Sequence, residues 1–158
     1  MQASGKFRSR KWLYLATGLL ATSALVSVTG CGLMMMHGTD AERPLASEFG
    51  LGPRLSAQGL YTATLVPTEE LRPRTMQSVQ VELADAMGTA IDGATIAIDG
   101  GMPEHGHGLP TRPRVTGNPG DGIYEIEGVR FNMGGWWEFK LAVASPAGAD
   151  TVTFNIEL

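Results

Sequence analysis

The residues best suited to chemistry lie between positions 100 and 111, where the sequence reads GGMPEHGHGLPT. His105 and His107 are two positions apart, a spacing that places both imidazoles on one side of an extended chain. Met102 can add a thioether, and Glu104 can add a carboxylate or support a ligand. This mixture of sulfur and imidazole suits copper, since methionine favours Cu(I) and imidazole tolerates Cu(II). Zinc comes second, because it would more usually have another histidine, a cysteine or a second close acid.

The same loop also has a purely structural interpretation. Its glycines permit positive φ, one imidazole can hydrogen-bond to the backbone, and the other can stack on a tryptophan. Met102 and Met133 can fill gaps in a hydrophobic core. The residues alone therefore predict either a metal site or a loop that serves structure or protein contact.

Catalytic groupings are scarce in this sequence. Only His105 or His107 could complete a serine–histidine–acid combination, and no serine lies in a nucleophile-elbow context. No glycine-rich loop between a strand and a helix is present to hold a phosphate. We therefore expect a protein that is not an enzyme and has no catalytic residues.

The N-terminal region predicts export. Four basic residues at positions 6–11 precede an apolar run, WLYLATGLLATSALVSV, that ends at TGC. This is the pattern of a secretory signal over residues 1–30. Residues 28–31, VTGC, resemble the lipobox of bacterial lipoproteins, which implies a lipid on Cys31. An ordinary signal peptide with a free thiol is the alternative, and the single cysteine excludes an intrachain disulfide.

The expected location is the cell envelope. Gly32 after the lipobox cysteine implies, by the same resemblance, a periplasm-facing lipoprotein of the outer membrane. Residues 1–30 hold four of the twelve Lys and Arg residues and none of the sixteen acids, so the processed chain has eight bases, sixteen acids and a net charge of −8. Such an acidic chain is a poor nucleic-acid binder. The expected partners are the membrane, through the lipid, and an envelope protein.

The processed chain divides into a tether and one domain. Residues 31–57 mix Gly, Pro, Ser and charges without a sustained period, which favours a flexible, lipid-anchored tether. Residues 58–158 contain short segments of alternating polarity separated by turn residues, and none of them has a convincing helical period. These segments are 59–66, 78–83, 94–99, 122–129, 136–144 and 150–158. The pattern predicts an all-β fold, an immunoglobulin-like antiparallel β-sandwich of about seven strands.

That topology would bring separate parts of the chain to one pole. In an immunoglobulin-like arrangement the connections after the first, third and fifth strands lie at the same end. Met102 and both loop histidines fall in one of these connections, Met133 falls in another, and Met76 ends a third. Trp136 would shield a metal there from water, whereas Trp137 would anchor the core.

Residues 100–143 resemble the YtkA-like/FixH-like domain family. The matching features are a Met-Pro-x-His-Gly-His-Gly segment, a tyrosine-containing strand, a Phe-x-Met-x-Gly turn and a tryptophan-containing strand. The resemblance implies a small exported or membrane-anchored β-sandwich, linked in some members to copper handling or to assembly of haem–copper oxidases. The positions that match are Met102, His105, His107 and Met133. Unlike membrane-embedded relatives, this chain has a lipobox.

These observations lead to two functional hypotheses. The first is a copper carrier or chaperone that binds copper, or another soft metal, at the Met/His pole. The second is a protein-interaction module of the cell envelope that has the same fold and binds no metal.

Overall fold

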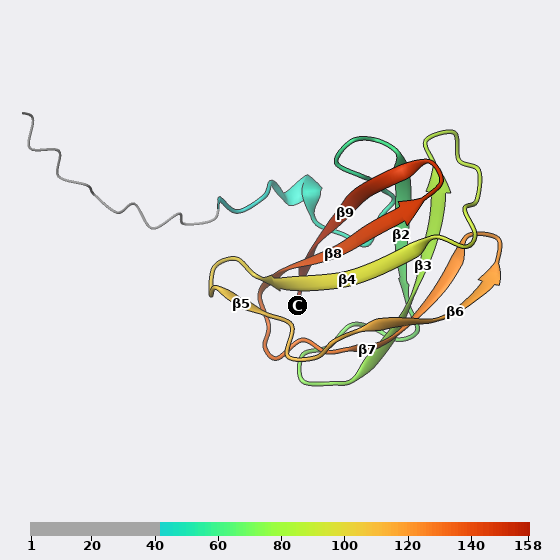
Figure 1. Ribbon diagram of the computed structural model, residues 1–158. Coiled ribbons are helices and arrows are strands. Elements are labelled where there is room, and N and C mark those ends of the chain that lie inside the picture. Colours follow the sequence, from blue (N-terminus) through green and yellow to red (C-terminus); the bar gives the residue numbers. More distant parts are fainter. Residues whose placement is uncertain (1–41) are drawn as a thin grey trace, which may run out of the picture. The chain divides into compact units, whose positions relative to one another are not determined.

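The computed structural model describes residues 42–158, which form two stacked antiparallel sheets (Figure 1). One sheet has the order β1-β2-β3-β7-β6, and the other has the order β5-β4-β8-β9. The elements are η1 (Ala46–Glu48), β1 (Arg54–Leu55), β2 (Tyr61–Pro67), β3 (Gln77–Asp85), β4 (Thr95–Met102), β5 (His107–Gly108), β6 (Arg114–Gly120), β7 (Ile123–Val129), β8 (Trp136–Ser145) and β9 (Gly148–Glu157). The predicted signal, Cys31 and the first part of the predicted tether lie outside the described residues.

The strand order confirms the predicted fold class. The order β2-β3-β7-β6 in one sheet, against β4-β8-β9 in the other, is that of a constant-type immunoglobulin sandwich. Seven strands have seven to ten residues, and the two others, β1 and β5, have only two residues each. Residues 42–158 contain no helix that is long and apolar enough to cross a membrane.

The alternating pattern of the sequence becomes the core between the sheets. Side chains on β8 and β9 alternate between the inside and the outside of the sandwich, because successive strand residues point to opposite faces. The inward residues of these two strands are almost completely buried: Trp137, Phe139, Leu141, Val143, Val152, Phe154 and Ile156. They pack against inward residues of the other sheet, among them Val79, Val81, Leu83, Tyr124 and Ile126. Residues 42–158 thus have their own hydrophobic core, as an independently folding domain does.

Strand β6 has no counterpart among the six alternating segments found in the sequence. Its sequence, RVTGNPG, contains Gly117 and Pro119, and both residues disfavour strands. Its pairing with β7 shifts register on both sides of Gly117. A proline is tolerated here because β6 lies at the edge of its sheet, where an N–H group is not needed for pairing.

The segment 43–57, which we call the N-terminal strap, packs against the sandwich. It lies within the region expected to be a flexible tether, but its backbone hydrogen-bonds to both sheets. Gly50 N–H donates to Asn155 O at 2.9 Å, and Leu65 N–H donates to Leu51 O at 2.6 Å. The residues of β1 pair with β2. The strap therefore covers the free edges of β2 and β9, which would otherwise expose unpaired backbone groups.

Three connections meet at one end of the sandwich, which we call the loop pole. They are residues 68–76 between β2 and β3, residues 103–113 between β4 and β6, and residues 130–135 between β7 and β8. Pro73 and Phe131 form a backbone bridge between the first and the third of these connections. The candidate site lies at this pole, as the sequence predicts.

Candidate metal site at the loop pole

The β4–β5 hairpin places Met102 beside His107. These two residues are direct cross-strand partners, so their side chains lie on the same face of the hairpin. The hairpin turns through residues 103–106, where the N–H groups of His105 and Gly106 donate to Met102 O at 3.1 and 2.9 Å. Gly106 has a φ of 66°, which glycine adopts without strain. A tight turn therefore gathers the predicted methionine and both histidines.

The two imidazoles lie side by side. Their ring centroids are 5.9 Å apart, and their planes are 15° from parallel. Two imidazoles that share one ion through bonds of about 2.0–2.1 Å have centroids roughly 5 to 6.5 Å apart, depending on the bond angle. The observed separation falls in this range, but the rings are stacked, and a shared ion must lie in the plane of each ring, so one imidazole must turn before both can bind the same ion. His105 is exposed and His107 is half-buried, so the pair lies at the boundary between the core and solvent.

His107 has a buried ring nitrogen without a hydrogen-bond partner. Its Nδ1 atom is inaccessible to solvent and receives no hydrogen bond from residues 42–158. The ring lies against the indole of Trp137, with centroids 5.8 Å apart. A buried polar atom left unpaired costs about 1–3 kcal/mol. A ligand at this nitrogen would offset that cost, because neutral imidazole nitrogen is a common metal ligand.

Met102 points toward the connection between β7 and β8. Its side chain is 1% exposed, and its Cε atom lies 3.0 Å from the position that a Cβ atom would take at Gly135. Glycine at position 135 thus leaves room for the methionine methyl group. The thioether is buried, so a metal ion could reach it only if the side chains around it move apart.

Met133 lies in the same connection and is partly buried against the core. Its carbonyl oxygen accepts a hydrogen bond from Trp137 Nε1 at 3.0 Å. Trp137 therefore contacts His107 with its ring and holds the Met133 backbone with its N–H group. This tryptophan, which the sequence identified only as a core anchor, links the two connections that carry the predicted ligands.

Trp136 does not occupy the position expected of it. The sequence suggested that Trp136 would shield the site, but Trp137 is the tryptophan that lies against His107. Trp136 points to the outer face of its sheet, because neighbouring strand residues face opposite ways. There its Nε1 donates to Asn155 Oδ1 at 3.0 Å, and its ring packs edge-on against Phe49 of the strap.

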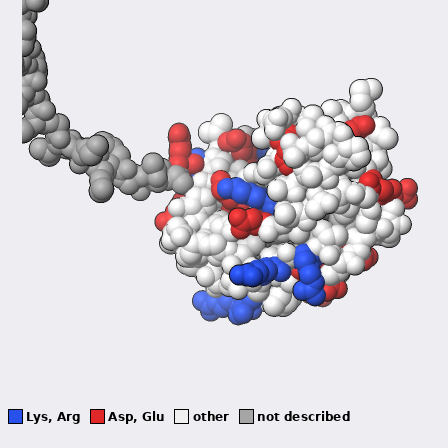
Figure 2. Space-filling model, in the orientation of Figure 1, with Lys and Arg blue, Asp and Glu red and all other residues white. Residues whose placement is uncertain are grey.

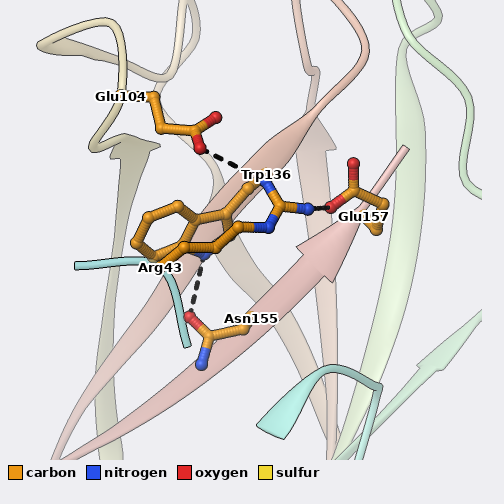
Figure 3. Close-up of polar contacts among 5 residues, drawn as sticks. All are labelled: Arg43, Glu104, Trp136, Asn155 and Glu157. Carbon is orange, nitrogen blue, oxygen red and sulfur yellow. Dashed lines mark hydrogen bonds and ion pairs between the residues drawn. The ribbon is translucent and has the colours of Figure 1, made fainter. Parts of the chain in front are cut away.

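Arg43 joins the strap to the histidine loop (Figure 3). Its guanidinium group pairs with Glu104 at 3.3 Å and also with Glu157, and it lies over the rings of Phe49 and Trp136. Glu104, a candidate ligand or ligand support in the sequence, is therefore engaged by an arginine. Sequence reasoning missed Arg43 because it falls in the segment assigned to the tether, and no local pattern indicates its distant partners.

Met76 lies apart from the hairpin. Met76 is 60% exposed and lines a separate groove with Thr68, Glu70 and Gln77. Cys31 lies outside the described residues. Within residues 42–158, no three His, Cys, Asp or Glu side chains are placed together so that they could hold a metal ion. A site of three side-chain ligands at the hairpin would therefore need methionine sulfur beside the two histidines.

Comparison with known proteins gives a family for the chain. The family model described as YtkA-like matches residues 56–142, which include β2 to β7, most of β8 and the whole Met/His hairpin. No curated protein and no solved structure shows significant similarity to the chain. The family match covers more than half of the sequence and includes the three connections of the loop pole. The chain belongs to the YtkA-like family.

Proposed function

We propose that the domain binds copper, as Cu(I), through Met102, His105 and His107 and acts as a metal carrier or chaperone. Met133 is the candidate for a fourth ligand. The observation that carries the proposal is the cross-strand pair of Met102 and His107, in which the buried Nδ1 atom of His107 has no partner among the described residues. A soft metal ion at this position would satisfy that nitrogen.

The available donor atoms favour copper over zinc. Structural zinc sites are usually built from four cysteine or histidine ligands, and the described residues offer two histidines and no cysteine. Thioether sulfur selects Cu(I) among the common soft ions. His105 is exposed at the tip of the hairpin, which provides an open coordination position. A carrier must release its metal, and an incompletely enclosed site on a loop suits that task.

The proposed location is the periplasmic side of the outer membrane. The signal-like residues 1–30 and the lipobox-like tetrad that ends at Cys31 support export and attachment by a lipid. The proposed activity is binding and transfer, without catalysis.

A second candidate function is a protein-interaction module that binds no metal. The ion pair between Arg43 and Glu104 favours it, because this contact fixes the histidine loop without any metal ion. In that case the loop pole would bind an envelope protein directly.

Titration with Cu(I) tests the first candidate. The segment 42–158 is titrated against a chromophoric Cu(I) chelator, alongside the double variant His105→Ala/His107→Ala. We expect the double variant to lose at least about tenfold in affinity, as substitutions at metal sites commonly do. Met133→Leu should weaken binding less, whereas Met76→Leu is the matched control and should leave affinity unchanged.

Equal and weak binding by the wild-type segment and the double variant would remove the basis of the copper proposal. The interaction module would then be the better description. A titration with Zn²⁺ under the same conditions checks selectivity, and we expect weaker binding than with Cu(I).

A further inference from the structure

Arginines gather at one end of an otherwise acidic domain. Residues 42–158 contain eight Lys and Arg residues, and five of them lie in the connections of the loop pole or directly beside them. We call these five the arginine end: Arg72, Arg74, Arg112, Arg114 and Arg130. Residues 42–158 also contain fifteen acids, so the segment as a whole is acidic while its positive charge is concentrated at this end.

The backbone pairing explains why these five residues are neighbours. Arg72 and Arg74 precede β3, and Arg130 follows β7. Arg112 precedes β6, and Arg114 is its first residue. These three strands are adjacent in the order β3-β7-β6. Arg74 N–H donates to Phe131 O at 2.6 Å, and Arg114 is the register partner of Glu127. Figure 2 shows basic side chains along the lower border of the molecule, where Figure 1 places β7 and the β2–β3 connection.

Most of these arginines are available for a partner. All five are exposed, and only Arg72 forms an ion pair within residues 42–158, with Glu70 at 3.1 Å. The acids in the three connections of the loop pole and on β6 and β7 are Glu69, Glu70, Glu104, Glu125 and Glu127. Glu104 is paired with Arg43, and Glu125 lies opposite Gly117, farther along β6 and β7, so three acids remain beside the five arginines. The arginine end therefore keeps a positive balance. Arginine is also the residue that binds carboxylate and phosphate groups in a bidentate manner.

The strap brings the chain to the same pole. Arg43, near the start of the described residues, contacts Glu104 in the β4–β6 connection. Cys31 precedes Arg43 by twelve residues, which can span at most about 40 Å when extended. A lipid on Cys31 would thus keep the domain within about that distance of the bilayer, and the described chain begins beside the loop pole. At that distance the anchor raises the effective concentration of lipid headgroups, so a few charge contacts suffice to orient the domain.

We propose that the arginine end docks the domain onto the phosphate groups of an anionic membrane surface. The proposal rests on the lipid-anchored location proposed above but not on the metal site. Docking turns the loop pole toward the bilayer and gives the domain a defined orientation on it. The acidic remainder of the domain stays directed away from the membrane by repulsion.

Vesicle sedimentation tests this proposal without the anchor and without copper. The segment 42–158 is mixed at about 20 mM salt, where surface charges are weakly screened, with vesicles of phosphatidylcholine alone or with about 30% phosphatidylglycerol. We expect binding only to the anionic vesicles, and its loss at about 200 mM salt. Arg112→Gln/Arg130→Gln should lower the partition coefficient at least about tenfold.

The matched control is Arg54→Gln/Lys140→Gln, which removes the same charge from β1 and β8. This variant should bind the anionic vesicles as the wild-type segment does. Equal loss in both double variants, or equal binding to both kinds of vesicle, overturns the proposal. Binding to soluble polyglutamate without binding to anionic vesicles also overturns it, and assigns the arginine end to an acidic protein. None of these outcomes depends on the copper titration.

Discussion

Asp150 is a buried carboxylate that connects the first turn after the strap to β9. Its side chain accepts the N–H groups of Gln58 at 2.9 Å and Leu60 at 3.3 Å, and Ser56 supplies a further hydrogen bond. Burial raises the pKa of Asp150, but the hydrogen bonds from Ser56, Thr151, Gln58 and Leu60 together outweigh it and hold the pKa below its usual value. The ionised form therefore stabilises the fold.

We predict that Asp150→Asn lowers the melting temperature at pH 7, because the amide nitrogen cannot accept the N–H groups that the carboxylate holds. The folded pKa lies below the unfolded value of about 3.9, so this stabilisation is complete above that value and is lost as the pH falls through the folded pKa. Thermal unfolding by circular dichroism at pH 7 and near pH 3 should show the gap between the two proteins shrinking in acid. The control is Asp121→Asn, an exposed turn residue with a φ of 56°, which asparagine adopts readily. A gap that is constant with pH would contradict the role assigned to the charge.

The β4–β5 hairpin shows how an element positions a site through its glycines. Gly101 and Gly108 are cross-strand partners beside the pair of Met102 and His107. A Cβ atom at Gly101 would lie 2.8 Å from His107 O, whereas a Cβ atom at Gly108 would meet nothing closer than 3.4 Å. The close approach of β5 to β4 therefore requires glycine at only one of these two positions.

We predict that Gly101→Ala destabilises the segment 42–158 by about 1–3 kcal/mol, the usual cost of overpacking. The added methyl group must push β5 away from β4 and so displace His107. Gly108→Ala has the same chemical change at the opposite position and should cost less than about 1 kcal/mol. Urea unfolding of the two variants measures the difference. Equal effects would mean that the hairpin can relax around the methyl group.

Six of the seven long strands could be predicted from period-two alternation, the edge strand β9 among them, but β6 and the two-residue strands β1 and β5 could not. The pattern at β8 and β9 is regular because one face of each strand lines the core. Strand β6 is an edge strand with Gly117 and Pro119, and its weak burial leaves no alternating pattern in the sequence. Strand β5 has two residues and exists only because the turn returns the chain onto β4.

The candidate ligands of the site could be predicted from the sequence, but the residues that surround and hold them could be predicted less well. The spacing of His105 and His107 and the immunoglobulin-like order together place Met102 and Met133 at the same pole, as observed. The inward position of Trp137 was predictable, but its contact with His107 was not, because that contact depends on how the hairpin folds over the core. The role of Arg43 was not predictable either, because its partners lie 61 and 114 positions away in the sequence.

At the scale of the whole molecule, the strap completes the sandwich. It pairs with the edges of both sheets, and its Phe49 covers Trp136, which is only 1% exposed although it lies on the outer face of its sheet. The family match begins at residue 56, after most of the strap. The expected start of the domain at residue 58 would leave these contacts out.

We predict that a segment of residues 58–158 is less stable than residues 42–158 by about 3 kcal/mol or more, because it exposes the Trp136 ring and loses the burial of Phe49 and Leu51. It should also self-associate, since the edge of β9 becomes free. Chemical unfolding and size-exclusion chromatography measure the two effects. Phe49→Ala in the longer segment should cause part of the same loss of stability, but it should not cause self-association. If the two segments were equally stable and monomeric, the strap would be only a tether.

The placement of Trp137 also gives the domain a built-in optical reporter. Its indole lies against His107 and is hydrogen-bonded to the Met133 carbonyl, whereas Trp136, the other tryptophan in residues 42–158, is on the opposite face of the sheet. Phenylalanine in place of Trp136 would leave Trp137 as the sole source of indole emission in this segment. Since copper ions quench nearby indoles, the fluorescence of this single side chain would follow loading and release at the loop pole without an attached dye.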